Sequence, residues 1–423
     1  MLTSICGIDW GDEGKGCMVD LLSSDFDVVC RYQGGNNAGH TVINDKGKFI
    51  LNLLPSGILR ENVVNVMGNG MVIDIKHLCG EMARLREKGI RITPENLKIS
   101  DKAVITMPYH VLQDCLEEDR LAGKKFGSTR RGIAPVYADK YMKKAFRMGE
   151  LLDFERMCSR LPDIVEWKNL TVVGGYNADP VTVEAMREYF ETYGLPLREY
   201  ICDVGVYLNE AHQAGKKIMF EAQLGALRDI DFGIYPYTSS SSTIAAYAPI
   251  GAGVPNLQLD NSIGIMKAYS SCVGEGPFVC EYFGEKAERL RALGGEYGAA
   301  TGRPRRVGPF DVLASRYGIR CQGAREIALT KLDVLSDYEE IEICTGYELN
   351  GKRLTEFPFT DVLSDCKPVF ETVKGWHCDI SKCRKKEELP EEARDYIAYI
   401  ERACGCYIKY VSVGAEREAY IVM

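Results

Sequence analysis

Two glycine-rich segments near the N-terminus carry a carboxylate, a lysine and a histidine in a pattern suited to phosphate chemistry. The first reads GIDWGDEGKG over residues 7–16, and the second reads GGNNAGHT over residues 34–41. Apolar runs before and after the first segment predict a strand, a glycine turn and the start of a helix. Backbone N–H groups at such a helix start attract phosphate, and Lys15 adds a positive charge. The spacing differs from the G-x-x-x-x-G-K-S/T loop, so a different kind of phosphate cradle is expected.

Asp12 and His40 are the residues of these segments that can move protons. A carboxylate beside phosphates is repelled unless it holds Mg²⁺ or accepts a proton during the reaction. His40 follows another apolar run, residues 28–32. Together the two side chains predict acid–base chemistry beside a phosphoryl group. Spacing alone also allows the alternative in which Asp12 caps the helix and His40 is an ordinary loop residue.

The elements that must position these segments alternate between strands and helices. Apolar runs such as residues 63–70 precede amphipathic stretches such as residues 75–88, where Leu78, Met82 and Leu85 share one face. Residues 150–215 also have a helical pattern. Such alternation predicts an α/β fold with a mainly parallel central sheet and helices on both faces. No repeat or low-complexity linker interrupts the chain, so we expect residues 1–423 to form one domain with helical insertions.

The composition is typical of a cytoplasmic enzyme. The chain has 423 residues, of which 46% are hydrophobic and 26% are charged, so it can bury a large core. A net charge of −8 argues against nucleic acid as the main partner. The N-terminus lacks a basic leader with an apolar core, and no run is long enough to span a membrane.

Sixteen cysteines are scattered along the chain and cluster only near the C-terminus. That late cluster comprises Cys366, Cys378, Cys383, Cys404 and Cys406, with His377 beside it. The C-x4-C and C-x-C spacings do not match a standard pair of zinc-binding pairs. Reduced thiols are therefore favoured over a metal site.

Four motifs give the chain a resemblance to a known family. WGDEGKG and GGNNAGHT, followed by TGRPRR at residues 301–306 and TKLD at residues 330–333, resemble adenylosuccinate synthetase, the GTP-dependent ligase that joins aspartate to IMP in purine biosynthesis. The resemblance extends from Ile5 to about Ile421, with the motifs in the family's order. It implies a P-loop-like GTP-binding ligase fold, one Mg²⁺ per active site and a homodimer whose active sites are shared between subunits.

The family's GTP site maps onto both ends of the chain. The resemblance assigns the phosphates to Gly14, Lys15, Gly16, Gly39, His40 and Thr41, and Mg²⁺ to Asp12 and Gly39. Lys331 and Asp333 resemble a guanine-binding element, in which a carboxylate accepts hydrogen bonds from N1–H and the 2-amino group. An exposed Lys/Asp pair at a strand end remains the alternative for this short motif. Ser412 and Gly414 match the family segment that packs around guanine, although Ala415 replaces its proline.

The site for the acceptor nucleotide is expected to use residues from several segments. The stretch GSTRRGIAP at residues 127–135 combines hydroxyls and arginines that suit a monophosphate, although a basic surface turn remains the alternative. By resemblance, the candidates for binding the nucleoside monophosphate are Asn37, Thr129, Arg130, Lys143, Gln223, Leu224 and Ser239.

Several of these positions depart from the family pattern. Arg130 replaces a glycine, and Lys143 replaces an arginine that reaches across the dimer. Leu224 stands where the family has its glutamine, and Gln223 is displaced by one residue, which on a strand means the opposite face. The other departures are Cys17 for lysine, Phe232 for histidine, Ser239 for threonine and Ala300 for threonine. We expect an altered nucleotide pocket, and we hypothesise that Arg130 compensates for Lys143.

The amino-acid site is expected near Val273 and in the loop of residues 299–306. Arginines around a glycine suit a dicarboxylate, because each guanidinium can hold one carboxylate with paired bonds. The resemblance assigns aspartate binding to Val273, Thr301, Arg303 and Arg305. A basic solvated turn would also explain the charges of this loop.

The combined pattern predicts a two-step ligation with Asp12, Lys15 and His40 as catalytic residues. Asp12 removes the N1 proton of a 6-oxopurine, and O6 then attacks the γ-phosphate of GTP. The amine of aspartate next displaces phosphate from C6. One alternative is a paralogous ligase that uses GMP, dGMP or an unusual amine. A non-catalytic nucleotide-binding relative is a second, but a pure binder needs no acid–base pair.

Overall fold

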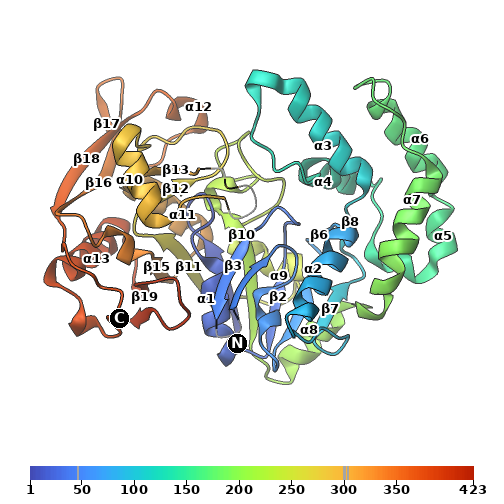
Figure 1. Ribbon diagram of the computed structural model, residues 1–423, viewed down its shortest axis with the longest axis horizontal. Coiled ribbons are helices and arrows are strands. Elements are labelled where there is room, and N and C mark those ends of the chain that lie inside the picture. Colours follow the sequence, from blue (N-terminus) through green and yellow to red (C-terminus); the bar gives the residue numbers. More distant parts are fainter. Residues whose placement is uncertain (45–46, 299–301, 303) are drawn as a thin grey trace.

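A large central sheet organises the computed structural model, which describes residues 1–44, 47–298, 302 and 304–423. Over these residues the sheet has ten strands in the order β20-β19-β15-β11-β1-β10-β2-β5-β7-β9 (Figure 1). Every neighbouring pair is parallel except β19 with β20, which is antiparallel. The predicted α/β fold with a mainly parallel sheet is therefore confirmed. In sheet order, the strands are β20 Tyr420–Val422, β19 Ile408–Ser412, β15 Glu326–Thr330, β11 Asn261–Lys267, β1 Leu2–Gly7, β10 Ile218–Gly225, β2 Val28–Arg31, β5 Val64–Met67, β7 Leu97–Ser100 and β9 Ile201–Cys202.

Helices cover both faces of this sheet. On β1, Ile5 packs toward α1 with Met18, whereas Cys6 packs on the other face in the cluster that contains Leu208 of α8. All six residues of β1 are buried, as expected for a strand covered on both sides. The helices are α1 Lys15–Leu22, α2 Ile75–Glu87, α3 Pro108–Leu121, α4 Ile133–Met142, α5 Phe154–Cys158, α6 Leu161–Val172, α7 Val183–Tyr189, α8 Val204–Gln213, α9 Ala248–Ala252, α10 Gly284–Gly294, α11 Val312–Gln322, α12 Thr360–Leu363 and α13 Glu391–Cys404.

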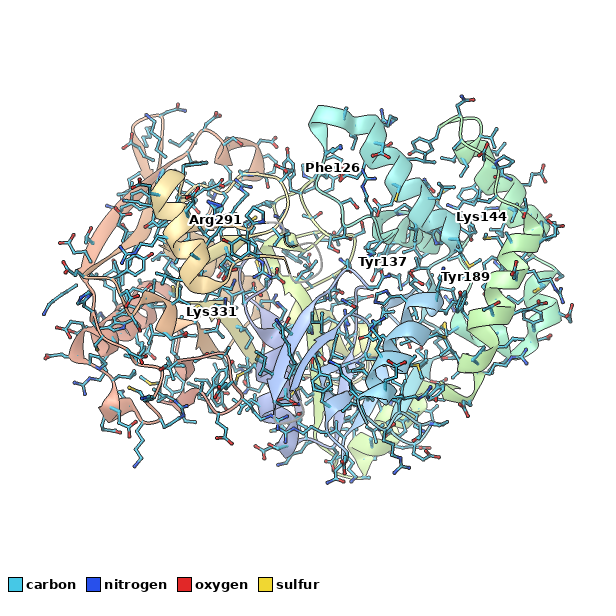
Figure 2. The ribbon with its side chains drawn as sticks, viewed as in Figure 1. Phe126, Tyr137, Lys144, Tyr189, Arg291 and Lys331 are labelled. Atoms are coloured by element: carbon cyan, nitrogen blue, oxygen red, sulfur yellow. The ribbon has the colours of Figure 1, made fainter. Side chains whose placement is uncertain are left out.

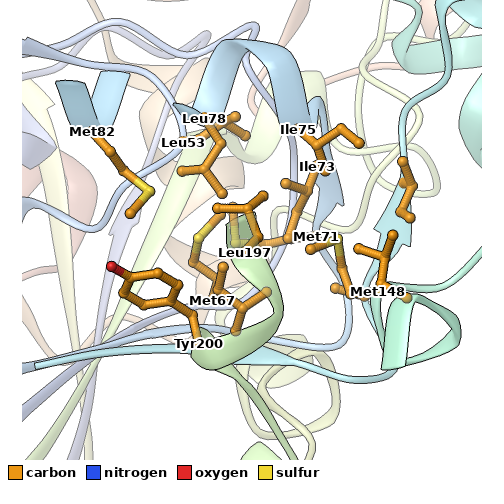
Figure 3. Packing of buried hydrophobic residues seen from close by; sticks show 14 of the residues in the cluster. Leu53, Met67, Met71, Ile73, Ile75, Leu78, Met82, Met148, Leu197 and Tyr200 are labelled. Atoms are coloured by element: carbon orange, nitrogen blue, oxygen red, sulfur yellow. The ribbon is translucent and has the colours of Figure 1, made fainter. Parts of the chain in front are cut away.

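The helical insertions gather beside the β7 and β9 edge of the sheet, at the right of Figure 1. Helix α2 confirms the predicted helix, and the Asp74 carboxylate caps it by accepting from the His77 N–H at 2.9 Å. Leu78 and Met82 of α2 are buried in a core shared with Met148 and Tyr200 (Figure 3). Residues 150–215 form α5 to α8 and short 3-10 and π-helical turns, as their pattern predicts, but they also contain the edge strand β9, which the helical pattern did not predict.

Smaller sheets complete the chain. Among the described residues, β14 Phe310–Asp311, β16 Glu340–Leu349, β17 Lys352–Leu354 and β18 Lys367–Lys374 form a four-stranded sheet, which α13 helps to cover. The remaining pairs are β3 His40–Asn44 with β4 Gly47–Leu51, β6 Val72–Ile73 with β8 Val104–Ile105, and β12 Ser270–Cys272 with β13 Arg306–Gly308. In the part of the chain that the structure describes, no helix is both long and apolar enough to cross a membrane. Within the same residues, no three His, Cys, Asp or Glu side chains lie together as a metal site.

A buried polar network joins α3, α4 and α6. His110 Nε2 lies 2.7 Å from Asp139 Oδ2, and Lys168 Nζ lies 2.7 Å from the same oxygen. The Met107 N–H donates to His110 Nδ1 at 3.0 Å, so that nitrogen must be unprotonated. Burial, opposed by the hydrogen bond to Asp139, lowers the pKa of His110 from its usual 6.5 to about 4.

We expect this network to make the fold acid-sensitive. Because the folded-state pKa lies below the usual value, the unfolded chain binds the proton first, so the stabilisation is complete above about pH 6.5 and is lost as pH falls toward 4. The loss should reach about 3 kcal/mol at most. Urea unfolding between pH 7.5 and 4.5 measures it. His110→Gln keeps an acceptor for Met107 and a donor to Asp139 without titrating, so equal pH slopes for this variant and the wild type would contradict the prediction.

Candidate active site

The sequence motifs meet at one edge of the central sheet. Strands β1, β2, β10, β11, β15 and β19 are parallel, and the predicted site segments follow their carboxyl ends, where α/β sheets place their ligands. A cavity of about 320 Å³ lies there. Among the predicted residues, those that line it are Asp12, Gly14, Lys15, Gly16, Asn37, Gly39, His40, Thr41, Gln223, Leu224, Arg305, Lys331, Ser412 and Gly414.

The first glycine segment forms a tight turn before α1. Gly11 and Gly14 have φ of 103° and 99°, and Gly14, in the left-handed conformation, is the N-cap of α1. Because Gly14 occupies the cap without a side-chain bond, Asp12 is not the helix cap, and that interpretation is excluded. Asp12 itself has φ of 59° and its carboxylate is partly exposed to the cavity. This conformation is uncommon for non-glycine residues, and functional sites are among the places where it occurs.

Glu13 stabilises the turn from inside. Its carboxylate accepts from the N–H groups of Asp9 at 3.1 Å and Gly11 at 2.8 Å. The same carboxylate lies 2.5 Å from Lys15 Nζ, and both side chains are buried. Glu13 therefore holds the cradle and fixes Lys15 at its base. Sequence reasoning did not single out Glu13, although it lies in the same motif as Asp12.

His40 is held by a buried carboxylate. Its Nδ1 lies 2.6 Å from Glu221 Oε1, and Glu221 also accepts from the N–H of Ser56 at 2.7 Å and its hydroxyl at 2.6 Å. Burial alone would raise the pKa of Glu221, but hydrogen bonding to His40 and Ser56 and nearby positive charge hold it below its usual value. An ionised Glu221 keeps the proton on Nδ1 and leaves Nε2 as the nitrogen available to a ligand. Glu221 lies in the same segment as the predicted Gln223, but sequence reasoning did not identify it as the partner of His40.

Asp333 lies in the short turn of helix that follows β15, outside the residues that line the cavity, and it carries a buried acceptor. Its Oδ1 atom has no hydrogen-bond partner among the described residues, and burial raises the pKa of this carboxyl. A buried orphan acceptor needs an explanation, and a ligand with N–H donors supplies one. Lys331 beside it has φ of 59° and lies below α10, where Figure 2 labels it. Ser412 and Gly414 close this end of the cavity, and the Ser412 hydroxyl donates to the Gly414 carbonyl at 2.9 Å.

Gln223 and Leu224, the two candidates for the position of the family's glutamine, both line the cavity. Gln223 is buried, accepts from Arg31 Nη2 at 2.9 Å and donates to Asn37 Oδ1 at 2.6 Å. Leu224 has φ of 63°, so the regular alternation of β10 breaks there. Both residues consequently line the same cavity, and the expected placement on opposite faces is wrong. Asn37 Oδ1 accepts from Gln223, so the amide N–H₂ group of Asn37 is available to donate to a ligand.

The other nucleotide candidates lie outside the residues that line the cavity. Thr129 and Lys143 are exposed, and Ser239 donates its N–H to the Arg228 carbonyl at 2.8 Å. Arg130 forms an ion pair with Asp119 on the surface of α3. Of the further departures, Cys17 lines the cavity, where burial raises the pKa of its thiol to about 11. Phe232 is half exposed, and its carbonyl accepts from the Tyr317 hydroxyl at 2.6 Å.

Arg130→Gly should be tolerated. Arg130 has φ of 54°, a conformation that costs a non-glycine residue roughly 1 kcal/mol. Glycine relieves that strain. The gain in stability is roughly cancelled by two losses, namely the surface ion pair with Asp119 and the larger conformational entropy of glycine in the unfolded chain. We therefore expect an unfolding free energy within about 1 kcal/mol of wild type, measured by urea titration, with Lys125→Gly on the same loop as a control at negative φ. A KM for the acceptor nucleotide raised tenfold would instead support compensation for Lys143.

Arg228 organises the segment around Val273, a residue predicted to contact aspartate. Its guanidinium donates to the carbonyls of Tyr237, Val273 and Glu275 and to Cys272 Sγ at 2.9 Å. These bonds fix the turn that carries Val273, whose side chain is 45% exposed and available for contact. Sequence reasoning missed Arg228, since no motif marks it. The predicted Thr301 and Arg303, and the substituted Ala300, lie outside the described residues.

Arg305 contacts Asp12, the predicted base. Its Nη2 lies 3.1 Å from Asp12 Oδ2, and its Nη1 lies 2.8 Å from Glu296 Oε2. The Arg305 Nε atom is buried and has no partner among the described residues. An anionic substrate that displaces Asp12 from Arg305 would free the carboxylate to act as a base.

Comparisons with known proteins agree on one family. The family model described as adenylosuccinate synthetase matches residues 4–421. Adenylosuccinate synthetases of Lactococcus lactis subsp. lactis (strain IL1403) and subsp. cremoris (strain SK11) are 44% and 43% identical to the chain over 416 residues, which is 98% of this chain and 96% of each relative.

Two solved structures are similar in fold. The fully ligated adenylosuccinate synthetase from Plasmodium falciparum has a TM-score of 0.93 and 36% identity, covering 100% of this chain and 99% of the other. The cyanophage S-2L succinoaminodeoxyadenylate synthetase, bound to dGMP and dATP, has a TM-score of 0.59 and 18% identity, covering 100% and 95%. The second likeness concerns the fold alone.

Proposed function

The chain belongs to the adenylosuccinate synthetase family, and from that premise we propose how its residues join L-aspartate to C6 of IMP at the expense of GTP. The products are adenylosuccinate, GDP and phosphate. The observation that carries the proposal is the presence of Asp12, His40, the phosphate cradle and Lys331 in the lining of one cavity. A proton acceptor, a phosphate site and a base-reading element are what this ligation needs.

GTP is proposed to lie along the cavity from the cradle to Asp333. The N–H groups at the start of α1 and the Lys15 charge bind its phosphates, together with the segment of Gly39, His40 and Thr41. The orphan Asp333 Oδ1 accepts from the guanine ring. Guanine has two neighbouring donors, N1–H and the 2-amino group, whereas adenine lacks that pair. This orientation places the γ-phosphate near Asp12 and His40.

IMP is proposed to bind with its N1 beside Asp12. Asp12 takes the N1 proton, O6 attacks the γ-phosphorus, and the bond to the β-phosphate oxygen breaks to release GDP. In its doubly protonated form, His40 keeps its Nδ1–H on Glu221 and donates from Nε2 to the phosphate oxygens, and so stabilises the charge that develops there. The aspartate amine then attacks C6, gives up a proton, and phosphate leaves. Asn37 donates its amide to an acceptor on the purine, while Thr129 and Ser239 hold the 5′-phosphate.

The aspartate substrate is proposed to lie between Val273 and Arg305. Arg305 exchanges its contact with Asp12 for a substrate carboxylate, with Thr301 and Arg303 completing the site. This exchange provides both the anion contact and the release of the base.

Mg²⁺ is proposed to bind between Asp12 and Gly39. Both residues line the cavity beside the phosphate cradle. Among the described residues, only one carboxylate oxygen of Asp12 has a partner, so its other oxygen and the Gly39 carbonyl oxygen could serve as ligands. Oxygen ligands together with nucleotide phosphates suit this cation. When bound, Mg²⁺ would neutralise phosphate charge.

A homodimer and a single domain complete the proposal. Tyr141 and Met142 at the end of α4 are 77% and 57% exposed, and Lys143 follows them. Exposed apolar side chains next to a cation suit an interface in which each Lys143 serves the other subunit's nucleotide. Residues 1–423 are proposed to fold as one unit in which the helical insertions support the sheet.

The test is an acceptor panel run with purified protein. GTP, Mg²⁺ and aspartate are supplied with IMP, dIMP, GMP, dGMP or no acceptor, and phosphate release and product mass are recorded. We expect a succinyl adduct with IMP. A higher kcat/KM with GMP or dGMP would establish the paralogue alternative, and no turnover with any acceptor would refute the proposed reaction.

A further inference from the structure

The carboxylate of Glu296 lies at the centre of a buried polar cluster behind the cavity. Glu296 is fully buried and accepts from Lys267 Nζ at 2.8 Å, from the Tyr269 hydroxyl and from Lys331 Nζ at 3.1 Å, all through Oε1. Its second oxygen accepts from Arg305 Nη1 at 2.8 Å. Both carboxylate oxygens of Glu296 therefore accept hydrogen bonds, and its negative charge is paired with neighbouring cations.

The charges of this cluster depend on Glu296. Burial alone would raise the pKa of Glu296, but the charges of Lys267, Lys331 and Arg305 hold it well below its usual range. Burial lowers the pKa of Lys267 to about 8 despite the carboxylate beside it. Three buried or half-buried cations thus share one permanent anion. Removing that anion would leave them to repel each other at low dielectric.

Glu296 also spans two ends of the site that bind different substrates. Through Oε1 it holds Lys331, which carries the predicted contact to guanine. Through Oε2 it holds Arg305, which contacts Asp12 and faces the proposed aspartate site. The backbone reinforces both links, because Lys331 Nζ also donates to the Gly294 carbonyl and the Arg305 N–H donates to the Glu296 carbonyl at 2.9 Å. One short segment, residues 294–296, fixes both side chains.

We infer that Glu296 is a positioning residue that aligns Lys331 and Arg305 and thereby couples GTP binding to aspartate binding. The inference rests on the proposed function, because it assigns substrates to the two ends. When guanine orders Lys331, the shared carboxylate is ordered with it, and Arg305 is then already placed for the substrate carboxylate. Because the entropy cost of ordering these side chains is met when the first ligand binds, the second ligand binds more tightly. IMP is proposed to meet the cavity through Asp12, Asn37, Thr129 and Ser239, none of which contacts Glu296 directly, so its binding should depend on Glu296 much less.

Glu296→Gln tests this coupling by removing one charge with little change in shape. We expect KM to rise about tenfold or more for both GTP and aspartate, since a charged hydrogen bond is lost at each end. KM for IMP should stay within about threefold. In the wild type, saturating aspartate should lower KM for GTP, and in Glu296→Gln that dependence should vanish. A merely structural defect would not separate IMP from the other two substrates.

Three further variants sharpen the result. Glu342→Gln is the matched control, because Glu342 accepts from the Tyr282 hydroxyl at 2.7 Å and Lys286 at 2.9 Å but lies outside the cavity, so all KM values should stay unchanged. Adding Lys267→Met to Glu296→Gln restores the charge sum without the tether, and both KM values should remain high. Where Glu296→Gln does not fold, Tyr269→Phe removes one donor to Oε1 and should raise the same two KM values about threefold.

The outcomes separate the two proposals. An inactive wild type refutes the proposed function itself. An active wild type with normal KM values for GTP and aspartate in Glu296→Gln overturns the positioning role, as does full rescue by Lys267→Met, which would reduce Glu296 to a charge-balancing group.

Discussion

Asp12→Asn should lower kcat by about a thousandfold, within the range that a general base contributes. Asparagine cannot accept the N1 proton of IMP, so O6 does not become the nucleophile. The backbone should be unchanged, because Asp12 has φ of 59° and asparagine adopts this conformation more readily than most residues. Arg305 keeps its contact with Glu296 at 2.8 Å, so the neighbouring cation stays in place.

The measurement is kcat by phosphate release, with GTP affinity measured by calorimetry on the same protein. We expect the dissociation constant of GTP to stay within about threefold, because the phosphate cradle consists of N–H groups and Lys15. Asp25→Asn changes an exposed carboxylate just after α1 and serves as the control. A variant Asp12→Asn with more than about a tenth of wild-type kcat would rule out Asp12 as the base.

Asp333→Asn should weaken GTP binding by about a hundredfold or more, because a carboxylate acceptor for two donors is replaced by an amide with one acceptor and one donor. Asp333 Oδ1 is buried and lacks a partner among the described residues, so no other contact of the chain should compensate. Xanthine offers one donor and one acceptor at the same positions, which matches the amide. The variant should therefore prefer XTP to GTP.

Nucleotide preference is measured as the ratio of kcat/KM for GTP and XTP at saturating IMP and aspartate. Asp361→Asn on the surface of α12 is the control and should leave the ratio unchanged. KM for IMP should stay within about threefold in both variants. An unchanged GTP preference in Asp333→Asn would remove the guanine assignment, whatever happens to turnover.

The sequence was most informative where a motif is local. A turn of glycines between a strand and a helix exposes N–H groups, so the phosphate-binding role proposed for residues 7–16 follows from their order alone. Alternation of apolar runs and amphipathic stretches likewise suffices for a parallel sheet, because strands buried on both faces need helical crossovers. The fold class, the family and most of the cavity-lining residues were accessible in this way.

Contacts between segments that are far apart in the sequence could not be predicted from it. Glu221 is 181 residues from His40, and Gln223 is 186 residues from Asn37, yet each pair shares a hydrogen bond. The positive φ of Leu224 also reverses the face that strand alternation assigns to it. Such a backbone choice depends on what packs around the turn, and periodicity does not record it.

By itself, then, the sequence determined which chemical groups this protein offers for the proposed contacts to phosphate, guanine and dicarboxylate, because those groups lie in short motifs. Only the tertiary structure decided how they are aimed. Glu13, Glu221 and Glu296 hold Lys15, His40 and Arg305 in place, and the adjacent parallel strands β1, β10, β11 and β15 bring these partners together. The physical reason is that a buried charge is stable only beside its counter-charge, and that neighbour comes from wherever the sheet brings the chain together.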